Sequence, residues 1–135
     1  MQHTSNENFT PLDAFRHIQN RFKWDQEEVH IIALNSRYQI LRSELLFRGT
    51  VDACLFHPRD VFRFAIQHNA SAFFLVHNHP SGNSDPSNSD IVLTKKLLHL
   101  SRIMEIEFID HLIFTKNPYT SMRELKFFDL SRPRR

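Results

Sequence analysis

Glycine and cysteine are almost missing from this sequence. The 135 residues include two glycines, Gly49 and Gly82, and a single cysteine, Cys54. One cysteine excludes an internal disulfide framework and suits a reducing compartment, so a cytoplasmic location is expected. Because glycine is so rare, each one is expected where other residues would strain the backbone: Gly49 in a turn or bulge, and Gly82 in a closely packed loop. Neither indicates a phosphate-binding loop.

The chain also lacks a long apolar run and a strong charge of one sign. No segment reaches the roughly 18–20 apolar residues needed to span a bilayer, and the polar N-terminus has no signal-peptide core. No membrane partner is therefore expected. The net charge of +2 gives little general attraction to polyanions. Nucleic acid stays possible as a partner but is not supported by charge, and the basic residues 131–135 are expected to form a loose tail.

Hydrophobic residues make up 41% of the chain and include 13 phenylalanines, which is enough for the core of one domain. The apolar pattern predicts a helix from Pro11, strands at about 28–34 and 39–48, a helix at about 58–67, a buried strand at 72–76, a helix from Ser87 to about 102 and a strand at 106–114. Phe127 and Phe128 are expected to close the sheet or its edge. Strands that alternate with helices indicate an α/β (α+β) fold, with a mixed β-sheet flanked by helices.

The most informative stretch runs from His77 to Asp90 and has the form H-x-H-x7-S-x-x-D. If the buried strand continues into it, His77 and His79 project to the same side, because side chains two apart share a face. Ser87 and Asp90 form a helix-start pattern after a loop that contains proline and glycine. Two imidazoles and one carboxylate with an open fourth position are how catalytic zinc is held. The sequence therefore predicts a Zn²⁺ site with His77, His79 and Asp90 as ligands.

Simpler interpretations exist for each part of this pattern. Ser87 and Asp90 alone would be an ordinary helix cap, and a single histidine at a strand end is usually a satisfied polar residue. Four matched positions separated by a loop favour a metal site over these alternatives. The letters His-Asn-His also suggest an HNH nuclease, but three adjacent residues on a strand do not make the ββα metal finger of those enzymes.

At these residues the chain resembles the JAMM/MPN metalloproteases, and the longer form of the motif is similar to their RadC branch. The resemblance implies a cytidine-deaminase-like α+β architecture, with residues 1–24 as an N-terminal tail and helix and residues 25–135 as the RadC-like domain of a single-domain chain. It also implies hydrolysis of peptide or isopeptide amides, a peptide or protein substrate, and Ser87 as a donor to the oxyanion. Further matching segments are Phe47–Thr50, His57–Phe62, Asn69–Ala72 and Asp110–Ile113.

The same resemblance implies a glutamate on an early strand as general base. Glu27 and Glu28 are both candidates, and they face opposite sides of a strand because a one-residue slip reverses the face. The register counted back from the turn at Asn35 favours Glu27, with Glu28 as the alternative and Glu44 as a third choice. His111 lies on a strand that the family places beside the site; packing in the core or on the surface is favoured for it, and a role in supporting the ligands stays open.

Three functions are compatible with these residues. The first is an active zinc-dependent peptidase or isopeptidase, and the second is a non-catalytic MPN scaffold that works through partners. The third is a RadC-type DNA-repair or mobile-element protein, acting on or with nucleic acid. Full-length RadC-like proteins carry a helix-hairpin-helix region before the JAMM domain, and the residues before this domain leave no room for it. The sequence therefore predicts a short form, gives weak support to a DNA-binding role, and leaves the oligomeric state open.

Overall fold

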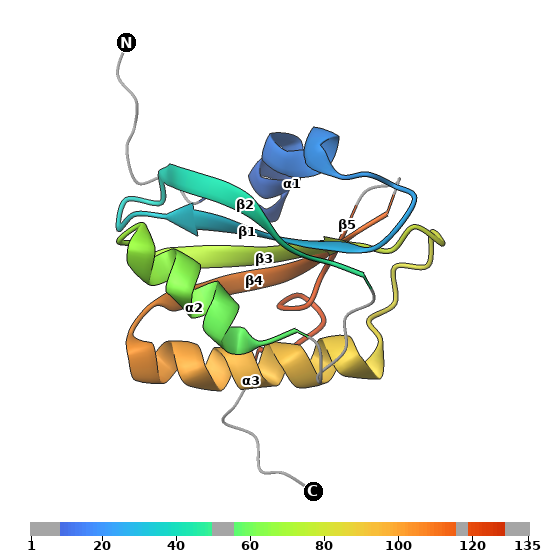
Figure 1. Cartoon of the computed structure of the whole chain (residues 1–135). Helices are drawn as coiled ribbons and strands as arrows, with labels where there is room; N and C mark the ends of the chain where they lie inside the picture. The colour runs from blue at the N-terminus through green and yellow to red at the C-terminus, as the bar shows by residue number, and fades with distance from the viewer. Residues whose placement is uncertain (1–8, 50–55, 116–118, 129–135) are drawn as a thin grey trace, which may run out of the picture.

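One five-stranded sheet organises the computed structural model, which describes residues 9–49, 56–115 and 119–128 (Figure 1). The strand order is β2-β1-β3-β4-β5, in which β3 and β4 are parallel and all other neighbours are antiparallel. The sheet is therefore mixed, and the α+β class expected from the sequence is confirmed. The strands are β1 (Glu28–Leu34), β2 (Ile40–Arg48), β3 (Ala72–Asn78), β4 (Glu107–Phe114) and β5 (Tyr119–Ser121).

In the described part of the chain, three α-helices cover the two faces of this sheet. Helix α1 (Pro11–Ile18), followed by a 3-10 turn at Gln19–Arg21, lies on one face, whereas α2 (Pro58–Gln67) and α3 (Asn88–Met104) lie on the other (Figure 1). Proline at the first position favours the starts of α1 and α2, since its missing N–H would have no partner there. The predicted helix starts at Pro11, Pro58 and after Ser87 are confirmed.

Each face of the sheet has its own hydrophobic core. On β1, Val29, Ile31 and Ala33 belong to the cluster packed with α2 and α3, while Ile32 and Leu34 belong to the cluster with α1. All seven residues of β1 and of β3 are buried. Both strands therefore lie inside the sheet between two layers of helix, as their continuous apolar runs predict. The C-terminal end of β3, where the histidine motif begins, therefore lies between the two hydrophobic cores.

The prediction that Phe127 and Phe128 close the sheet is wrong. The edge strand is β5, and residues 122–128 form turns. Phe128 is nevertheless buried, with its ring centroid 4.8 Å from that of Phe108 on β4. Its apolar side chain therefore covers the core from a turn, and burial alone does not require a strand.

The two glycines differ in their surroundings. Gly82 has φ +90°, and a Cβ added there would meet no atom within 4 Å. The expected close packing at Gly82 is therefore wrong, and the backbone conformation is what favours glycine there. Gly49 has φ +129° at the end of β2, where its N–H donates to the Glu27 carbonyl at 2.8 Å, in line with the expected turn. Cys54 and the tail 131–135 lie outside the described residues.

Among the helices in the ranges that the structure describes, none has the length and apolarity that crossing a bilayer requires.

Candidate metal centre

The proposed ligands meet where β3 ends and α3 begins. His77 is the sixth residue of β3, His79 follows the strand, and Asp90 is the third residue of α3. The Nε2 atoms of His77 and His79 lie 2.9 Å apart. Oδ1 of Asp90 lies 3.2 Å from Nε2 of His77, and Oδ2 lies 3.3 Å from Nε2 of His79. The structure thus brings together the three residues that the sequence pattern selected as ligands.

The two distances from Asp90 fit a tetrahedral zinc ion, and the distance between the two Nε2 atoms is somewhat shorter. With zinc–ligand bonds of about 2.0–2.1 Å, two ligand atoms of a tetrahedron are separated by about 3.3 Å. Oδ1 of Asp90 is also buried and has no hydrogen-bond donor in the described part of the chain. A buried carboxylate oxygen without a donor costs free energy that a bound cation would remove. The donor set of two imidazoles and one carboxylate therefore fits zinc.

His79 is held in the tautomer that a metal ligand needs. Its Nδ1 atom lies 2.7 Å from the Asn83 carbonyl oxygen. A carbonyl can only accept, so Nδ1 carries the hydrogen and donates it. In neutral His79 the lone pair then lies on Nε2, the atom that faces His77 and Asp90.

A second hydrogen-bonded chain stands behind His77. Its Nδ1 atom lies 2.9 Å from Nε2 of His111 on β4, and Nδ1 of His111 lies 2.6 Å from Oγ1 of Thr94 on α3. Burial lowers the pKa of the fully buried His111 to about 3, so this ring is neutral. When His77 donates through Nδ1 and His111 donates through its own Nδ1 to Thr94, the His77 lone pair lies on Nε2. This is the usual way in which a metal-binding histidine is oriented.

The sequence did not favour this place for His111. Packing in the core or on the surface was the favoured expectation, and His111 is indeed buried. Because it also contacts the proposed ligand His77, it fits the role of supporting the ligands, which the sequence left open. Thr94 was missed altogether. The only sequence signal for Thr94 is its position four residues after Asp90, one turn further along the same helix.

Asp90 has a double attachment. It forms a capping box with Ser87: the Ser87 Oγ atom accepts from the Asp90 N–H at 3.0 Å, and Asp90 Oδ2 accepts from the Ser87 N–H at 2.8 Å. Burial alone would raise the pKa of Asp90, but the close imidazoles of His77 and His79 and the hydrogen bond from the Ser87 N–H outweigh burial and hold that pKa below its ordinary range. The carboxylate is therefore ionised when it faces the two imidazoles.

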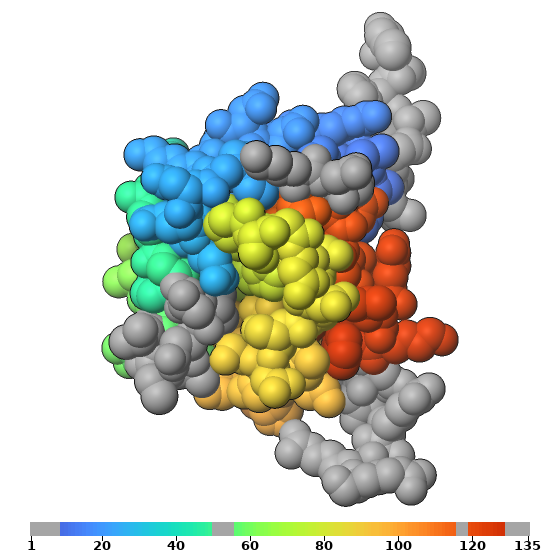
Figure 2. Space-filling model, turned by 90° about the vertical axis from the view of Figure 1, so that its right-hand side faces the viewer, coloured from blue at the N-terminus to red at the C-terminus, as the bar shows by residue number. Residues whose placement is uncertain are grey.

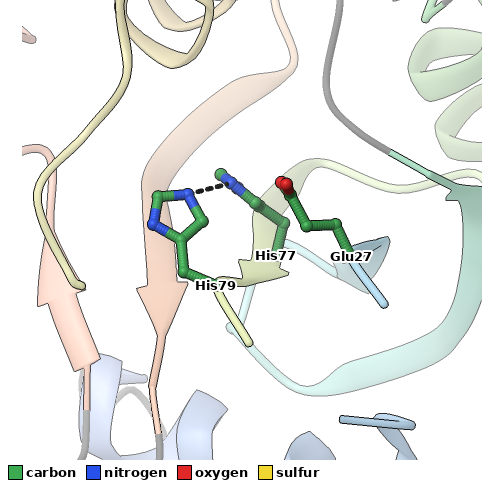
Figure 3. A group of neighbouring side chains, drawn as sticks. All are labelled: Glu27, His77 and His79. Atoms are coloured by element: carbon green, nitrogen blue, oxygen red, sulfur yellow. Dashed lines mark hydrogen bonds between the residues drawn. The ribbon is translucent and has the colours of Figure 1, made fainter. Parts of the chain in front are cut away.

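Glu27 and Glu28 lie on opposite sides of the sheet. A Glu27 carboxylate oxygen lies within 4.8 Å of ligand nitrogens of His77 and His79, and Figure 3 shows the three side chains pointing toward one another. Glu28 is buried on the α1 side, where its carboxylate accepts from Arg48 Nε at 3.0 Å and lies 3.1 Å from His30 Nε2.

Sheet register explains the difference. Val29 pairs with His77, so Glu27, two residues earlier, shares the face of His77, and Glu28 does not. Glu44 pairs with Ile31 near the middle of β1 and is not part of the group formed by Glu27 and the two histidines.

A cavity of about 380 Å³ opens beside the histidines. Figure 2 shows the loop after β3, in yellow, at the centre of this face, between the blue N-terminal segment and the red C-terminal one. Ser87 is exposed at the cavity, and no lysine or arginine is among the lining residues that the structure describes. These are Glu27, His79, Pro80, Ser81, Asn83, Asp85, Pro86 and Ser87.

A mixed sheet between helices, with an H-x-H…S-x-x-D site at the end of a central strand, defines a JAB (MPN) domain. The profile of the family described as "RadC-like JAB domain" matches residues 9–127. The chain therefore belongs to the RadC-like JAB domain family, and the resemblance drawn from the sequence is confirmed.

Similar proteins are known from several bacteria. The chain is 39% identical over 121 residues to a UPF0758 protein of Staphylococcus carnosus, covering 89% of this chain and 54% of the relative. It is 40% identical over 103 residues to one of Listeria welshimeri, covering 76% and 46%. It is 44% identical over 98 residues to one of Symbiobacterium thermophilum, covering 73% and 42%. The chain thus spans about half the length of the curated relatives it matches.

Proposed function

We propose that this domain is a zinc-dependent metallohydrolase of JAMM type, which cleaves peptide or isopeptide amide bonds. The observation that carries the proposal is the separation of 2.9–3.3 Å between the ligand atoms of His77, His79 and Asp90, with the Glu27 carboxylate beside them. When bound, a zinc ion supplies a Lewis acid that brings the pKa of a water molecule toward 7.

Glu27 is the proposed general base. Its side chain lines the cavity and lies beside the imidazoles without any other assigned partner among the described contacts. In the proposed reaction its carboxylate accepts a proton from the attacking water and passes that proton to the departing amine. An amide at this position could not accept the proton, which is why the carboxylate is needed.

Ser87 is the proposed donor to the oxyanion. Its Oγ atom already accepts from the Asp90 N–H, so the hydroxyl hydrogen can turn toward the cavity. A hydrogen bond to the developing negative charge on the substrate carbonyl oxygen is the kind of contact that contributes about 3 kcal/mol to catalysis.

The lining of the cavity favours an amide over a phosphodiester. Glu27 and Asp85 contribute negative charge, and none of the described residues that line the cavity is basic. A nucleic-acid backbone would be repelled there, because proteins bind phosphates chiefly through lysine and arginine. The non-catalytic scaffold would be favoured if Glu27 and Glu28 both pointed away from the metal site, whereas the Glu27 carboxylate lies beside the two histidines.

The test is metal analysis of the purified protein, combined with profiling on peptide and isopeptide substrates. We expect about one zinc per chain, its loss in His77→Ala, and hydrolysis that Glu27→Gln abolishes while zinc is retained. Undiminished zinc content in His77→Ala would overturn the ligand assignment. Full activity in Glu27→Gln would overturn the assignment of Glu27 as general base. Zinc binding without any amide hydrolysis would favour the non-catalytic scaffold instead.

A further inference from the structure

Asn78 lies between the two histidines in sequence, but its side chain belongs to a different set of contacts. It is fully buried at the last position of β3. Its Oδ1 atom accepts from the Glu28 N–H at 2.7 Å, and its Nδ2 atom donates to the Gln26 carbonyl at 3.1 Å. One side-chain amide thus holds the backbone on both sides of Glu27.

This amide replaces backbone pairing that ends at this point. Val29 and His77 form the last pair between β1 and β3, and regular β1 begins only at Glu28. Beyond that pair the chain stays bonded to β4, since the His79 N–H donates to the Phe114 carbonyl at 2.9 Å. On the β3 side, the backbone of residues 26–28 therefore has no strand pairing just where Glu27 must be placed.

Gly49 provides the attachment on the other side. Its N–H donates to the Glu27 carbonyl at 2.8 Å. With Asn78 bonded to the peptide groups before and after it, Glu27 is held at three backbone positions although it lies outside the strand. A catalytic base needs such support, because displacement by about 1 Å from the productive geometry costs on the order of 100-fold in rate.

We propose that Asn78 is a positioning residue that fixes the Glu27 carboxylate beside His77 and His79 through two hydrogen bonds to the Glu27-flanking backbone. This inference rests on the proposed function, since it gives Glu27 the role of base. Asn78 is not among the described residues that line the cavity, and both of its side-chain hydrogen bonds go to backbone next to Glu27. We therefore expect the side chain of Asn78 to act on the site through the position of Glu27.

The experiment is a double-mutant cycle with Glu27→Gln and Asn78→Leu, which keeps the branched shape of the side chain but removes both hydrogen bonds. The first readout is zinc affinity, measured by competition with a chelator and therefore independent of hydrolysis. A carboxylate next to the ligands attracts the cation, so each single variant should bind zinc up to about tenfold more weakly. If Asn78 acts only through Glu27, the double variant should bind zinc with the same affinity as the single variant that binds zinc less tightly. The second readout, with zinc saturating, is hydrolysis, where Asn78→Leu should lower kcat and leave KM unchanged.

A matched control lies at the other end of β1. The side chain of Asn35 is also hydrogen-bonded to backbone, since its Oδ1 atom accepts from the N–H groups of Arg37 and Gln39. Asn35→Leu should lower stability and leave zinc affinity and kcat unchanged. If Asn78→Leu does not fold, Asn78→Ser replaces it, because serine fits the same space and keeps a polar group.

The outcomes separate this inference from the proposed function. Effects of Glu27→Gln and Asn78→Leu that multiply in the double variant would overturn the positioning role, as would equal zinc affinity in all four proteins. Wild-type protein that binds zinc but hydrolyses no amide would count against the proposed function alone, because the zinc cycle would still report whether Asn78 acts through Glu27.

Discussion

Nδ1 of His77 lies 2.9 Å from Nε2 of His111, so a fully buried histidine on the neighbouring strand sets the orientation of a proposed ligand. His111 in turn is held by Thr94 on α3. The contact ties together β3, β4 and α3, the three elements that converge behind the site. Orientation of the ligand ring is thus built into the core.

The first prediction concerns this contact. His111→Phe keeps a ring in the core but removes the acceptor for His77, so zinc affinity should fall by about 10–100-fold. Chelator competition measures the change. His30→Phe is the control, because His30 is also buried but lies on the α1 side of the sheet. Unchanged zinc affinity in His111→Phe would contradict the orienting role.

The second prediction separates the adjacent glutamates. Glu28→Gln removes the carboxylate that pairs with Arg48 and His30, so the free energy of unfolding at pH 7 should fall by about 1–3 kcal/mol. Activity per folded molecule should not change. Glu27→Gln should show the opposite: nearly unchanged denaturant unfolding and lost hydrolysis. Glu28→Gln that inactivates without destabilising would reverse the assignment.

The stability effect at Glu28 should also depend on pH. Burial raises its pKa, but hydrogen bonds with His30, the Lys23 N–H and Arg48 outweigh burial, so the pKa lies below its ordinary value of 4.5. A lowered pKa in the folded state stabilises the fold above about pH 4.5, and this stabilisation is lost as the pH falls through the folded value. The difference between wild type and Glu28→Gln should therefore shrink in acid.

The third prediction concerns Ser87, which caps α3 and is also the proposed donor to the oxyanion. Ser87→Ala removes the helix cap and should lower the free energy of unfolding by about 1 kcal/mol. It should separately reduce turnover by about 100-fold or more, since it also removes the proposed oxyanion donor. Thr10→Ala, which removes the matching cap of α1, is the control: it should cost similar stability and leave turnover intact. Turnover lost only in proportion to unfolding would leave Ser87 as a cap alone.

The fourth prediction is that metal-free and zinc-loaded protein respond to pH in opposite ways at His79. Burial lowers its pKa, but the hydrogen bonds to Asp90 and the Asn83 carbonyl outweigh burial and raise it above 6.5. The metal-free fold should gain stability from protonated His79 below about pH 6.5 and lose it as the pH rises through the folded value. The difference in unfolding free energy between wild type and His79→Gln measures this.

Zinc binding needs the neutral ring, so zinc affinity should fall as the pH drops through the histidine range. Isothermal titration at several pH values checks this second trend. Zinc affinity that does not change between pH 8 and pH 5.5 would rule out imidazole ligands.

Local sequence rules were enough to predict that the three proposed ligands lie together. Alternation along a strand places His77 and His79 on one side, and a capping pattern places Asp90 in the first turn of a helix. These features depend on residues that are close in sequence. The same holds for the helix starts at Pro11 and Pro58, which were predicted to the residue.

Contacts between distant segments were not predictable in this way. Thr94 and His111 meet only because α3 packs over β4, and Asn78 meets Gln26 and Glu28 across about 50 residues of sequence. The wrong strand at Phe127 and Phe128 has a similar cause. Two adjacent phenylalanines indicate burial, but only the tertiary contact with Phe108 shows that a turn buries them.

The capping box of α3 has a consequence for how long an ion would stay in this site. The carboxylate of Asp90 closes the first turn of the helix and is also the proposed third ligand. Helix ends open and close locally far more often than a domain unfolds. Each such opening would withdraw one ligand while the two histidines stay in place. The residence time of the metal is therefore expected to follow the fraying of a helix end, so a substitution that strengthens this first turn should slow metal release without touching a ligand.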